Sequence, residues 1–313
     1  MPVPSEKRVD KNVFDAADRI VSSTVELANG TTRTETFSYD NNDAMVGTSS
    51  AGESVTFRYN ADGVLAGFSP NGAEQTFAYD ALGNRVMADV HVWIPDQNDT
   101  LKRPLLEYDA SGNFVRAYIW TGGMLLGYID AGNTLFVIHV DEMGGVAALS
   151  RTNGTIIHTA FYGPHGEDWG ATGTNPMPFA WLGSFGVQYI SHDTIIGGLY
   201  LTRYRLYSSV QQRFLSSDSM GLAGGLNLYA YGNGNPTKYI DPLGLCSQTS
   251  TGNYKPLSFN SYEAGPLARK SYETAGPLVR KSYETAGPLA RTKYTGREKV
   301  QILAIGPTVI PSL

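Results

Sequence analysis

The chain has 313 residues, a net charge of −5 and only 17% charged residues. This length allows one large domain or two modest ones, and the charge gives no indication of nucleic-acid binding over the whole chain. The 35 glycines, 19 tyrosines and 12 phenylalanines favour short strands and turns over long helices, so we expect an all-β protein.

The N-terminus, residues 1–7, lacks the apolar run of a secretory signal peptide. We therefore expect the protein to be secreted or displayed at the cell surface by a route that this sequence does not encode. The longest apolar-leaning stretch without charge, residues 117–129, is too short to cross a bilayer, so no membrane span is expected. Cys246 is the single cysteine, which rules out an internal disulfide. The five histidines lack the spacing of metal ligands, and we predict neither a metal nor a cofactor.

An aromatic motif recurs with a strict spacing of 20 residues, at 37–40, 57–60 and 77–80. A weaker copy at 13–20 precedes these three, and a further copy at 107–113 follows a polar, proline-containing insertion. Within each copy the Phe and Tyr are two residues apart and share one face of a strand, and turn-forming residues follow. Each copy is therefore predicted to form one hairpin.

Hairpins in series cannot each bury their own aromatic row, so they are expected to pair sideways into one curved sheet. Residues 1–116 are predicted to form this array. The motifs resemble the YD repeats of Rhs and teneurin-type proteins. That resemblance implies a hollow, shell-like β-sheet.

Residues 117–197 are predicted to be further shell strands that lead into the core. The string at 139–146 resembles the family's His-x-Asp-His-Leu-Gly-Ser-Val, with Glu142 in place of the second histidine and Gly145 in place of the serine. A His-x-Asp-Glu string can also indicate a metal or acid/base site, but we favour a turn between strands. Residues 161–167 resemble another turn of the family and are interpreted as structural.

Asp218 and Asp241 each lie among glycines, where backbone can approach a carboxylate closely. Two carboxylates in one pocket can share a proton, so that one activates water while the other protonates a leaving group. Aspartates beside glycine and proline are also common turn residues and helix caps, which is the structural alternative.

Residues 198–245 resemble the Rhs repeat-associated core, without insertion or deletion. The matching residues are Gly198, Leu199, Tyr200, Arg205, Arg213, Phe214, Leu215, Ser216, Asp218, Asn227, Tyr229, Tyr231, Asn235, Pro236, Asp241, Pro242, Leu243, Gly244 and Leu245. In that family two aspartates and the first arginine of the core carry out self-cleavage directly after an Asp-Pro-x-Gly-Leu motif. The resemblance therefore implies catalytic roles for Asp218, Asp241 and Arg205.

The implied cut falls between Leu245 and Cys246, after the motif residues Pro242, Leu243 and Gly244. Arg205 is expected to orient a carboxylate or to stabilise negative charge, with a structural ion pair as the alternative.

The core departs from the family's pattern at two turns. Ser208 and Ser209 replace an Asp-Pro pair, and Ser219 replaces the proline after the first catalytic aspartate. Neither change removes a catalytic residue. Looser turns at Ser209 and Ser219 are expected to slow the cleavage or abolish it.

The composition changes sharply after Leu245. Residues 246–313 carry nine Lys or Arg against four Glu, a net charge of +5, which leaves −10 for the rest. Three near-copies of one segment, at 261–270, 271–281 and 282–291, each contain Gly-Pro and few apolar residues. This tail is predicted to be a disordered, variable segment. In the family this position often holds a toxin, but a tail with no His and no Asp is poor material for a hydrolase.

The leading hypothesis is a self-cleaving shell segment, an intramolecular aspartic peptidase if it is active, whose substrate and cargo is its own C-terminal segment. Other shell or secretion-system proteins are further possible partners. One alternative is a non-cleaving structural or adhesive YD-repeat fragment. Another is a toxin or effector delivery protein whose activity resides in the tail.

Overall fold

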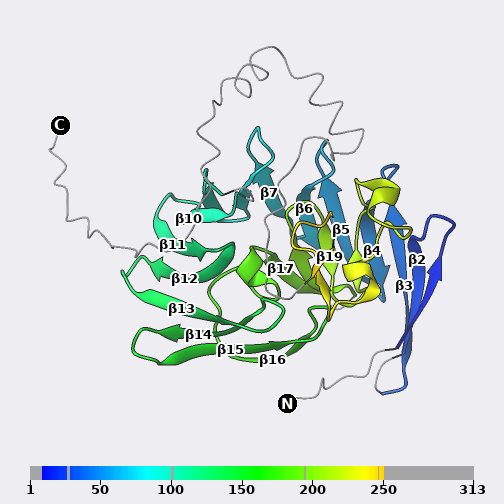
Figure 1. The fold of residues 1–313 in the computed structure, drawn as a ribbon. Helices are drawn as coiled ribbons and strands as arrows, with labels where there is room; N and C mark the ends of the chain where they lie inside the picture. The colour runs from blue at the N-terminus through cyan, green and yellow to red at the C-terminus, as the bar shows by residue number, and fades with distance from the viewer. Residues whose placement is uncertain (1–8, 27–28, 100–101, 194, 246, 250–313) are drawn as a thin grey trace, which may run out of the picture. The chain divides into compact units, whose positions relative to one another are not determined.

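The computed structural model describes residues 9–26, 29–99, 102–193, 195–245 and 247–249 (Figure 1). The chain divides into two compact units, Met1–Phe259 and Asn260–Leu313. The second unit lies outside the described residues, and so do Cys246 and the three tail repeats. The fold below is that of the first unit.

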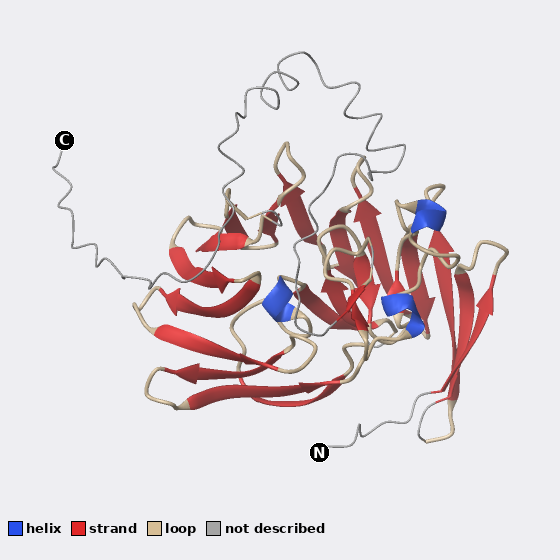
Figure 2. Ribbon diagram, in the orientation of Figure 1, coloured by secondary structure: helices blue, strands red, loops and turns tan. Residues whose placement is uncertain are grey.

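Sixteen strands form one antiparallel sheet in which every strand pairs with its neighbours in sequence. The strands are β1 (Val9–Phe14), β2 (Ile20–Glu26), β3 (Thr32–Tyr39), β4 (Met45–Ser50), β5 (Glu53–Tyr59), β6 (Leu65–Pro70), β7 (Gln75–Tyr79), β8 (Arg85–Ala88), β9 (His91–Pro95), β10 (Pro104–Asp109), β11 (Phe114–Thr121), β12 (Met124–Asp130), β13 (Leu135–Val140), β14 (Val146–Arg151), β15 (Ile156–Tyr162) and β16 (Asp168–Gly173). In the described residues the only helical segments are three short 3₁₀ turns, η1 (Gly183–Phe185), η2 (Gly221–Ala223) and η3 (Gly232–Gly234) (Figure 2). The all-β prediction is confirmed.

The repeat motifs form the ends of alternate strands. β3, β5 and β7 end at Tyr39, Tyr59 and Tyr79. The phenylalanine two residues earlier in each strand is buried, and the three tyrosines pack against the same hydrophobic cluster. Aromatic residues with a period of two thus line one face of the sheet, as the spacing predicts.

The residue after each repeat tyrosine fixes the turn that follows. Asp40 Oδ1 accepts hydrogen bonds from the backbone amides of Asn42 and Ala44, both at 2.9 Å. Asn60 makes the same pair of bonds with Asp62 and Val64. A side-chain oxygen that binds the amides two and four residues ahead holds the chain in a tight turn, and an Asn oxygen performs this as well as an Asp oxygen.

The His139 to Val146 string also forms such a turn. Asp141 Oδ1 accepts hydrogen bonds from the amides of Met143 at 2.9 Å and Gly145 at 2.7 Å. His139 Nε2 instead contacts Ser150 Oγ at 2.8 Å on the neighbouring strand. The favoured interpretation of this string, a turn between two strands, therefore describes its geometry.

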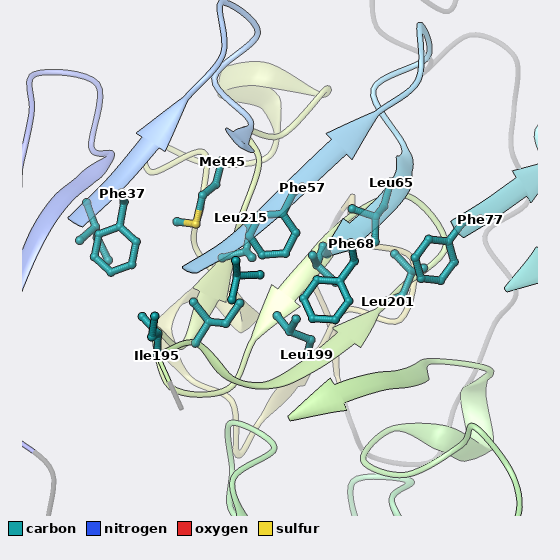
Figure 3. Packing of buried hydrophobic residues seen from close by; sticks show 14 residues of the cluster. Phe37, Met45, Phe57, Leu65, Phe68, Phe77, Ile195, Leu199, Leu201 and Leu215 are labelled. Atoms are coloured by element: carbon teal, nitrogen blue, oxygen red, sulfur yellow. The ribbon is translucent and has the colours of Figure 1, made fainter. Parts of the chain in front are cut away.

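A second sheet contains β17 (Gln188–Asp193), β18 (Gly197–Leu201), β19 (Leu206–Ser208) and β20 (Arg213–Phe214). The long sheet curves around β17 and β19 (Figure 1). Leu199, Leu201 and Leu215 pack against the repeat phenylalanines in one cluster (Figure 3). The Met45 amide also donates to the Leu215 carbonyl at 2.8 Å. The repeat strands thus form the hydrophobic surface against which residues 198–245, the predicted repeat-associated core, pack.

A two-stranded sheet and a further hydrophobic cluster complete the first unit. β21 (Tyr239–Ile240) pairs with β22 (Gln248–Thr249) in an antiparallel ladder. A second cluster of aromatic and aliphatic residues surrounds Trp181, Tyr207 and Tyr231, and it contains Ile240. No helix in the described residues is long and apolar enough to cross a membrane.

Candidate active site

Arg205 lies in the short connection between β18 and β19. Thr202 shapes this connection, because its Oγ1 accepts from the Arg205 amide at 3.0 Å and lies 2.7 Å from the Arg205 carbonyl. The guanidinium carbon lies 3.7 Å from the centre of the Phe214 ring. A cation over an aromatic face is stabilised by the ring quadrupole, and the ring also fixes the plane of the guanidinium.

The three predicted catalytic residues lie together in the interior. Arg205 Nη2 donates to Asp218 Oδ2 at 2.8 Å and lies 3.7 Å from Asp241 Oδ2. Their exposed fractions are 5% for Arg205, 8% for Asp218 and 2% for Asp241. One guanidinium nitrogen therefore faces both carboxylates where little water competes.

Asp241 is held by the backbone that follows it. Its Oδ1 accepts from the amides of Gly244 at 2.8 Å and Leu245 at 3.2 Å. Burial raises the pKa of Asp241, the Arg205 charge and these two amides oppose that rise, and the Asp218 charge adds to it. The net direction is upward, so Asp241 retains its proton to a higher pH than an ordinary aspartate.

Asp218 is fixed by a separate turn. Its amide donates to the Leu228 carbonyl at 2.9 Å, and its Oδ1 accepts from the Met220 amide at 2.8 Å. A methyl group added at Gly224 would lie 2.8 Å from Asp218 Oδ2, so the backbone approaches this carboxylate as closely as only glycine allows.

Three consecutive residues of the β18–β19 connection donate hydrogen bonds to three consecutive carbonyl groups of the cleavage motif. The Pro242 carbonyl accepts from the Arg203 amide at 3.3 Å, and the Leu243 carbonyl from the Tyr204 amide at 3.1 Å. The Gly244 carbonyl accepts from Arg205 Nε at 2.5 Å. Three consecutive bonds fix the path of the chain towards Leu245.

Gly244 is required by this geometry. It has a φ of +74°, and a methyl group there would lie 2.4 Å from Thr202 Oγ1. Any other residue would combine a left-handed backbone with a collision.

The ladder between β21 and β22 closes the loop that contains the predicted cut. Tyr239 pairs with Thr249 and Ile240 with Gln248, so the chain enters and leaves the loop side by side. Leu245 is half-buried, whereas Cys246 lies outside the described residues. The loop therefore holds the Leu245 side of the predicted scissile bond in a defined place.

The turn at Ser209, one of the two departures from the family's pattern, is closed by hydrogen bonds. Gly198 donates to Ser209 Oγ at 2.8 Å, and the Ser209 amide donates to the Gly198 carbonyl at 2.9 Å. Ser208 Oγ donates to the Ile196 carbonyl at 2.6 Å. Here the hydroxyl groups supply bonds that hold the turn without a proline. Ser219 lies in the turn that Asp218 closes through the Met220 amide.

Sequence reasoning singled out the acids and Arg205 but missed the residues that hold them. Thr202 and Arg203 bind the cleavage motif, Phe214 lies under the guanidinium, and the Tyr231 hydroxyl accepts from the Asp241 amide at 3.4 Å. Phe214 and Tyr231 belong to the matched core motif, and that match could have indicated them. No sequence pattern indicated Thr202 or Arg203.

A buried charge cluster on β9–β11 was also missed. Glu107 is fully buried and contacts His91 Nδ1 at 2.8 Å, Arg116 Nε at 3.1 Å and the Tyr118 hydroxyl. Hydrogen bonding to Glu107 raises the pKa of His91. The cluster belongs to the long sheet. Within the described part of the chain, no group of three or more His, Cys, Asp or Glu side chains could hold a metal ion.

No protein-family model matches this chain. Among curated proteins, it is 36% identical to "Toxin protein Tse5" of Pseudomonas aeruginosa over 107 residues, covering 34% of this chain and 8% of that protein. It is 30% identical to "tRNA3(Ser)-specific nuclease WapA" of Bacillus spizizenii over 170 residues, covering 52% of this chain and 7% of that protein. A crystal structure titled TcdB2-TccC3-TEV is similar with a TM-score of 0.46 and 16% identity, over 75% of this chain and 15% of that one.

The chain thus spans less than a tenth of the length of these two curated relatives. The sequence matches relate it to one protein named as a toxin and one named as a nuclease.

Proposed function

We propose that this chain is a segment of an Rhs/YD-repeat protein that cuts itself once, between Leu245 and Cys246, with Asp218 and Asp241 as the carboxylate pair. The observation that carries the proposal is the shared contact of Arg205 Nη2 with both carboxylates, at 2.8 and 3.7 Å. Two buried carboxylates on one cation, beside the bond to be cut, are the arrangement that acid/base peptide hydrolysis needs.

The two carboxylates take different roles. Asp218 makes the shorter contact with Arg205 Nη2, at 2.8 Å, and we assign it as the base. Asp241, whose pKa is raised by burial, is the acid. Water oxygen bonds to the Leu245 carbonyl carbon while its proton passes to Asp218. The bond to nitrogen then breaks as the Asp241 proton passes to Cys246, leaving a carboxyl group on Leu245 and an amino group on Cys246.

Positioning by the chain itself supplies much of the rate. Asp241 is four residues before the scissile bond, and its Oδ1 already accepts from the Leu245 amide. An intramolecular arrangement of this kind avoids the entropy of bringing two molecules together, and an enzyme that acts once needs no substrate pocket. Arg205 keeps both carboxylates in place and balances the charge of the pair.

A structural role is the second candidate, and one observation favours it. Asp241 Oδ1 binds amides ahead of it in the chain, as Asp40 and Asn60 do in the repeat turns. On this reading Asp241 only closes a turn, and the chain is a non-cleaving, adhesive part of a shell. Self-cleavage requires a group at position 241 that can lose a proton, whereas a structural turn requires only an oxygen that accepts hydrogen bonds.

The remaining features of the proposal follow the resemblance. Residues 1–116 form the repeat array, 117–197 the strands leading into the core, 198–245 the autoprotease core and 246–313 a variable tail. The tail is the substrate and the released cargo, and an effector activity would reside there. Similarity to one protein named as a toxin and one named as a nuclease supports this association, export by a route outside this sequence, and contact with other shell or secretion-system proteins.

Replacing each aspartate by asparagine tests the proposal. Asp218→Asn and Asp241→Asn should both leave the chain intact, whereas the parent yields a fragment that begins at Cys246, as measured by intact mass and N-terminal sequencing. Asn60 shows that Asn can hold a turn of this kind, so Asp241→Asn removes the ionising group and keeps the turn. Asp40→Asn is the matched control and should be cut like the parent. A parent chain that stays whole would favour the structural candidate.

A further inference from the structure

The turn of the third repeat carries a polar side chain where the turns of the first two repeats carry an apolar one. Asp80 Oδ1 accepts from the Asn84 amide at 2.9 Å. The corresponding residues of the first two turns are Ala44 and Val64, whose amides bind in the same way. Asn84 also donates from Nδ2 to Asp80 Oδ2 at 2.8 Å, and the residue is only 1% exposed. Since Ala and Val hold the same turn, the turn itself does not require the Asn84 side chain.

The oxygen of the Asn84 side chain binds the connection between β18 and β19. Asn84 Oδ1 accepts from Arg203 Nη2 at 2.9 Å, although the two residues are 119 positions apart. Burial acts to raise the pKa of Asp80, but hydrogen bonds from Asn84 and the Leu82 amide, together with the positive charge of Arg203, bring that pKa below its ordinary value. The charged Asp80 carboxylate thus fixes the Asn84 amide group and also attracts Arg203.

Arg203 is also the first of the three residues that bind the cleavage motif. Its amide donates to the Pro242 carbonyl at 3.3 Å, and the Tyr204 amide donates to the Leu243 carbonyl at 3.1 Å. A displacement of Arg203 therefore shifts the donors that define the path of the chain towards Leu245. Reaction rates depend steeply on such positions, since a misplacement of about 1 Å can cost on the order of 100-fold.

We infer that Asn84 is a positioning residue for the proposed self-cleavage, because its side chain fixes Arg203 and, through Arg203, the carbonyl groups of the cleavage motif. The inference rests on the proposed function, and Asn84 acts on the reacting groups only through Arg203. Cleavage then depends on the folded turn of the third repeat, so that a chain whose repeat sheet has not formed is not cut.

Asn84→Ala should be cut about ten-fold more slowly than the parent, in chain that is unfolded in denaturant and refolded by dilution. Ala44 shows that this kind of turn accepts alanine, so the variant is expected to fold. Asn113→Ala is the matched control. Asn113 makes the same bonds to Asp109, from Nδ2 at 2.9 Å and from its amide at 2.8 Å, but it is exposed and lies between β10 and β11. Its loss should leave the cleavage rate unchanged.

A substitution that keeps the oxygen separates positioning from turn stability. Asn84→Asp retains an oxygen for Arg203 and loses the bond to Asp80 Oδ2, as Asn84→Ala does. It should therefore be cut at nearly the parental rate, whereas a residue that merely stabilises the turn would make the two variants equally slow. Because Asn84 acts through Arg203, adding Asn84→Ala to Arg203→Ala should not slow the cleavage further.

Amide hydrogen exchange in the uncut Asp218→Asn chain measures the displacement of the connection. Adding Asn84→Ala should raise the exchange rate of the Arg203 and Tyr204 amides about ten-fold, and adding Asn113→Ala should leave it unchanged. Equal cleavage rates for Asn84→Ala and the parent, slower cleavage without faster exchange, or a slow Asn84→Asp chain would each overturn the inference. A parent chain that is never cut would instead overturn the proposed self-cleavage, and with it the role of Asn84.

Discussion

The backbone amide of Leu245 donates a hydrogen bond to Oδ1 of Asp241 at 3.2 Å. Leu245 supplies the carbonyl group of the bond that we propose to be cut. The carboxylate therefore touches the residue on which it would act, and the contact requires only the short loop between them. An aspartate that only closes a turn makes the same contact. Catalysis by Asp241 and a purely structural role therefore differ in their response to pH and to substitution.

The raised pKa of Asp241 predicts a pH dependence. The proposed acid must carry its proton, so cleavage should fall about ten-fold per pH unit once the pH rises above the pKa of folded Asp241. The rate is measured on chain that is unfolded in denaturant and refolded by dilution at each pH. A rate that rises with pH all the way to neutrality would exclude Asp241 as the acid.

The same shift has a consequence for stability. Because the pKa of Asp241 is higher in the folded chain than its ordinary value of 3.8, protonation stabilises the fold, fully below the unfolded pKa. That stabilisation is lost as the pH rises through the folded pKa. In uncut Asp218→Asn chain, adding Asp241→Asn should flatten the fall of unfolding free energy over this range. Denaturant titrations at several pH values measure it.

Arg205→Lys should cut the chain more slowly than the parent, by about 100-fold. The guanidinium uses Nε for the Gly244 carbonyl, Nη1 for the Leu228 carbonyl at 3.0 Å and Nη2 for the carboxylates. A single ammonium group keeps the charge but cannot reach all of these acceptors. Buried carbonyls without a donor should also lower the unfolding free energy by about 1–3 kcal/mol. An unchanged cleavage rate would make Arg205 purely structural.

Gly244→Ala should stop the cleavage, and Gly63→Ala should not. Both glycines have a left-handed backbone, with φ of +74° and +77°, so both substitutions carry the same backbone strain of about 1–2 kcal/mol. Only at Gly244 would the added methyl group collide, at 2.4 Å from Thr202 Oγ1, while nothing lies within 4 Å at Gly63. Cleavage extents from intact mass compare the pair directly. Equal behaviour of the two variants would contradict a role for the close packing of the loop.

Cys246→Ala should still be cut after Leu245 to nearly the parental extent. The proposed reaction uses water as the nucleophile, whereas a thiol mechanism would need the Cys246 sulfur. Acid breakage at Asp241-Pro242 would instead give a fragment that begins at Pro242 and would persist in denatured chain. N-terminal sequencing of the small fragment distinguishes these routes. A Cys246→Ala chain that stays whole while the parent is cut would point to the thiol.

The sequence by itself determined the features that depend on near neighbours. A period of two along a strand and of 20 along the chain is enough to predict the hairpins, because side-chain direction and turn geometry are local properties. Phe37, Phe57 and Phe77 are accordingly buried on one face. Their glycine-rich surroundings suggested Asp218 and Asp241 as a carboxylate pair, and the resemblance added Arg205. Nothing in the spacing of these residues, 13 and 23 positions, requires that they lie together.

Tertiary packing alone decided what those residues touch. Arg203 and Asn84 are 119 residues apart and share a hydrogen bond, because the second sheet packs within the curve of the first (Figure 1). Contacts over such separations depend on the twist of every intervening strand and on how the buried side chains of two sheets interdigitate. Strand twist and side-chain packing add up over many strands, so these long-range contacts cannot be predicted from any short segment of the sequence.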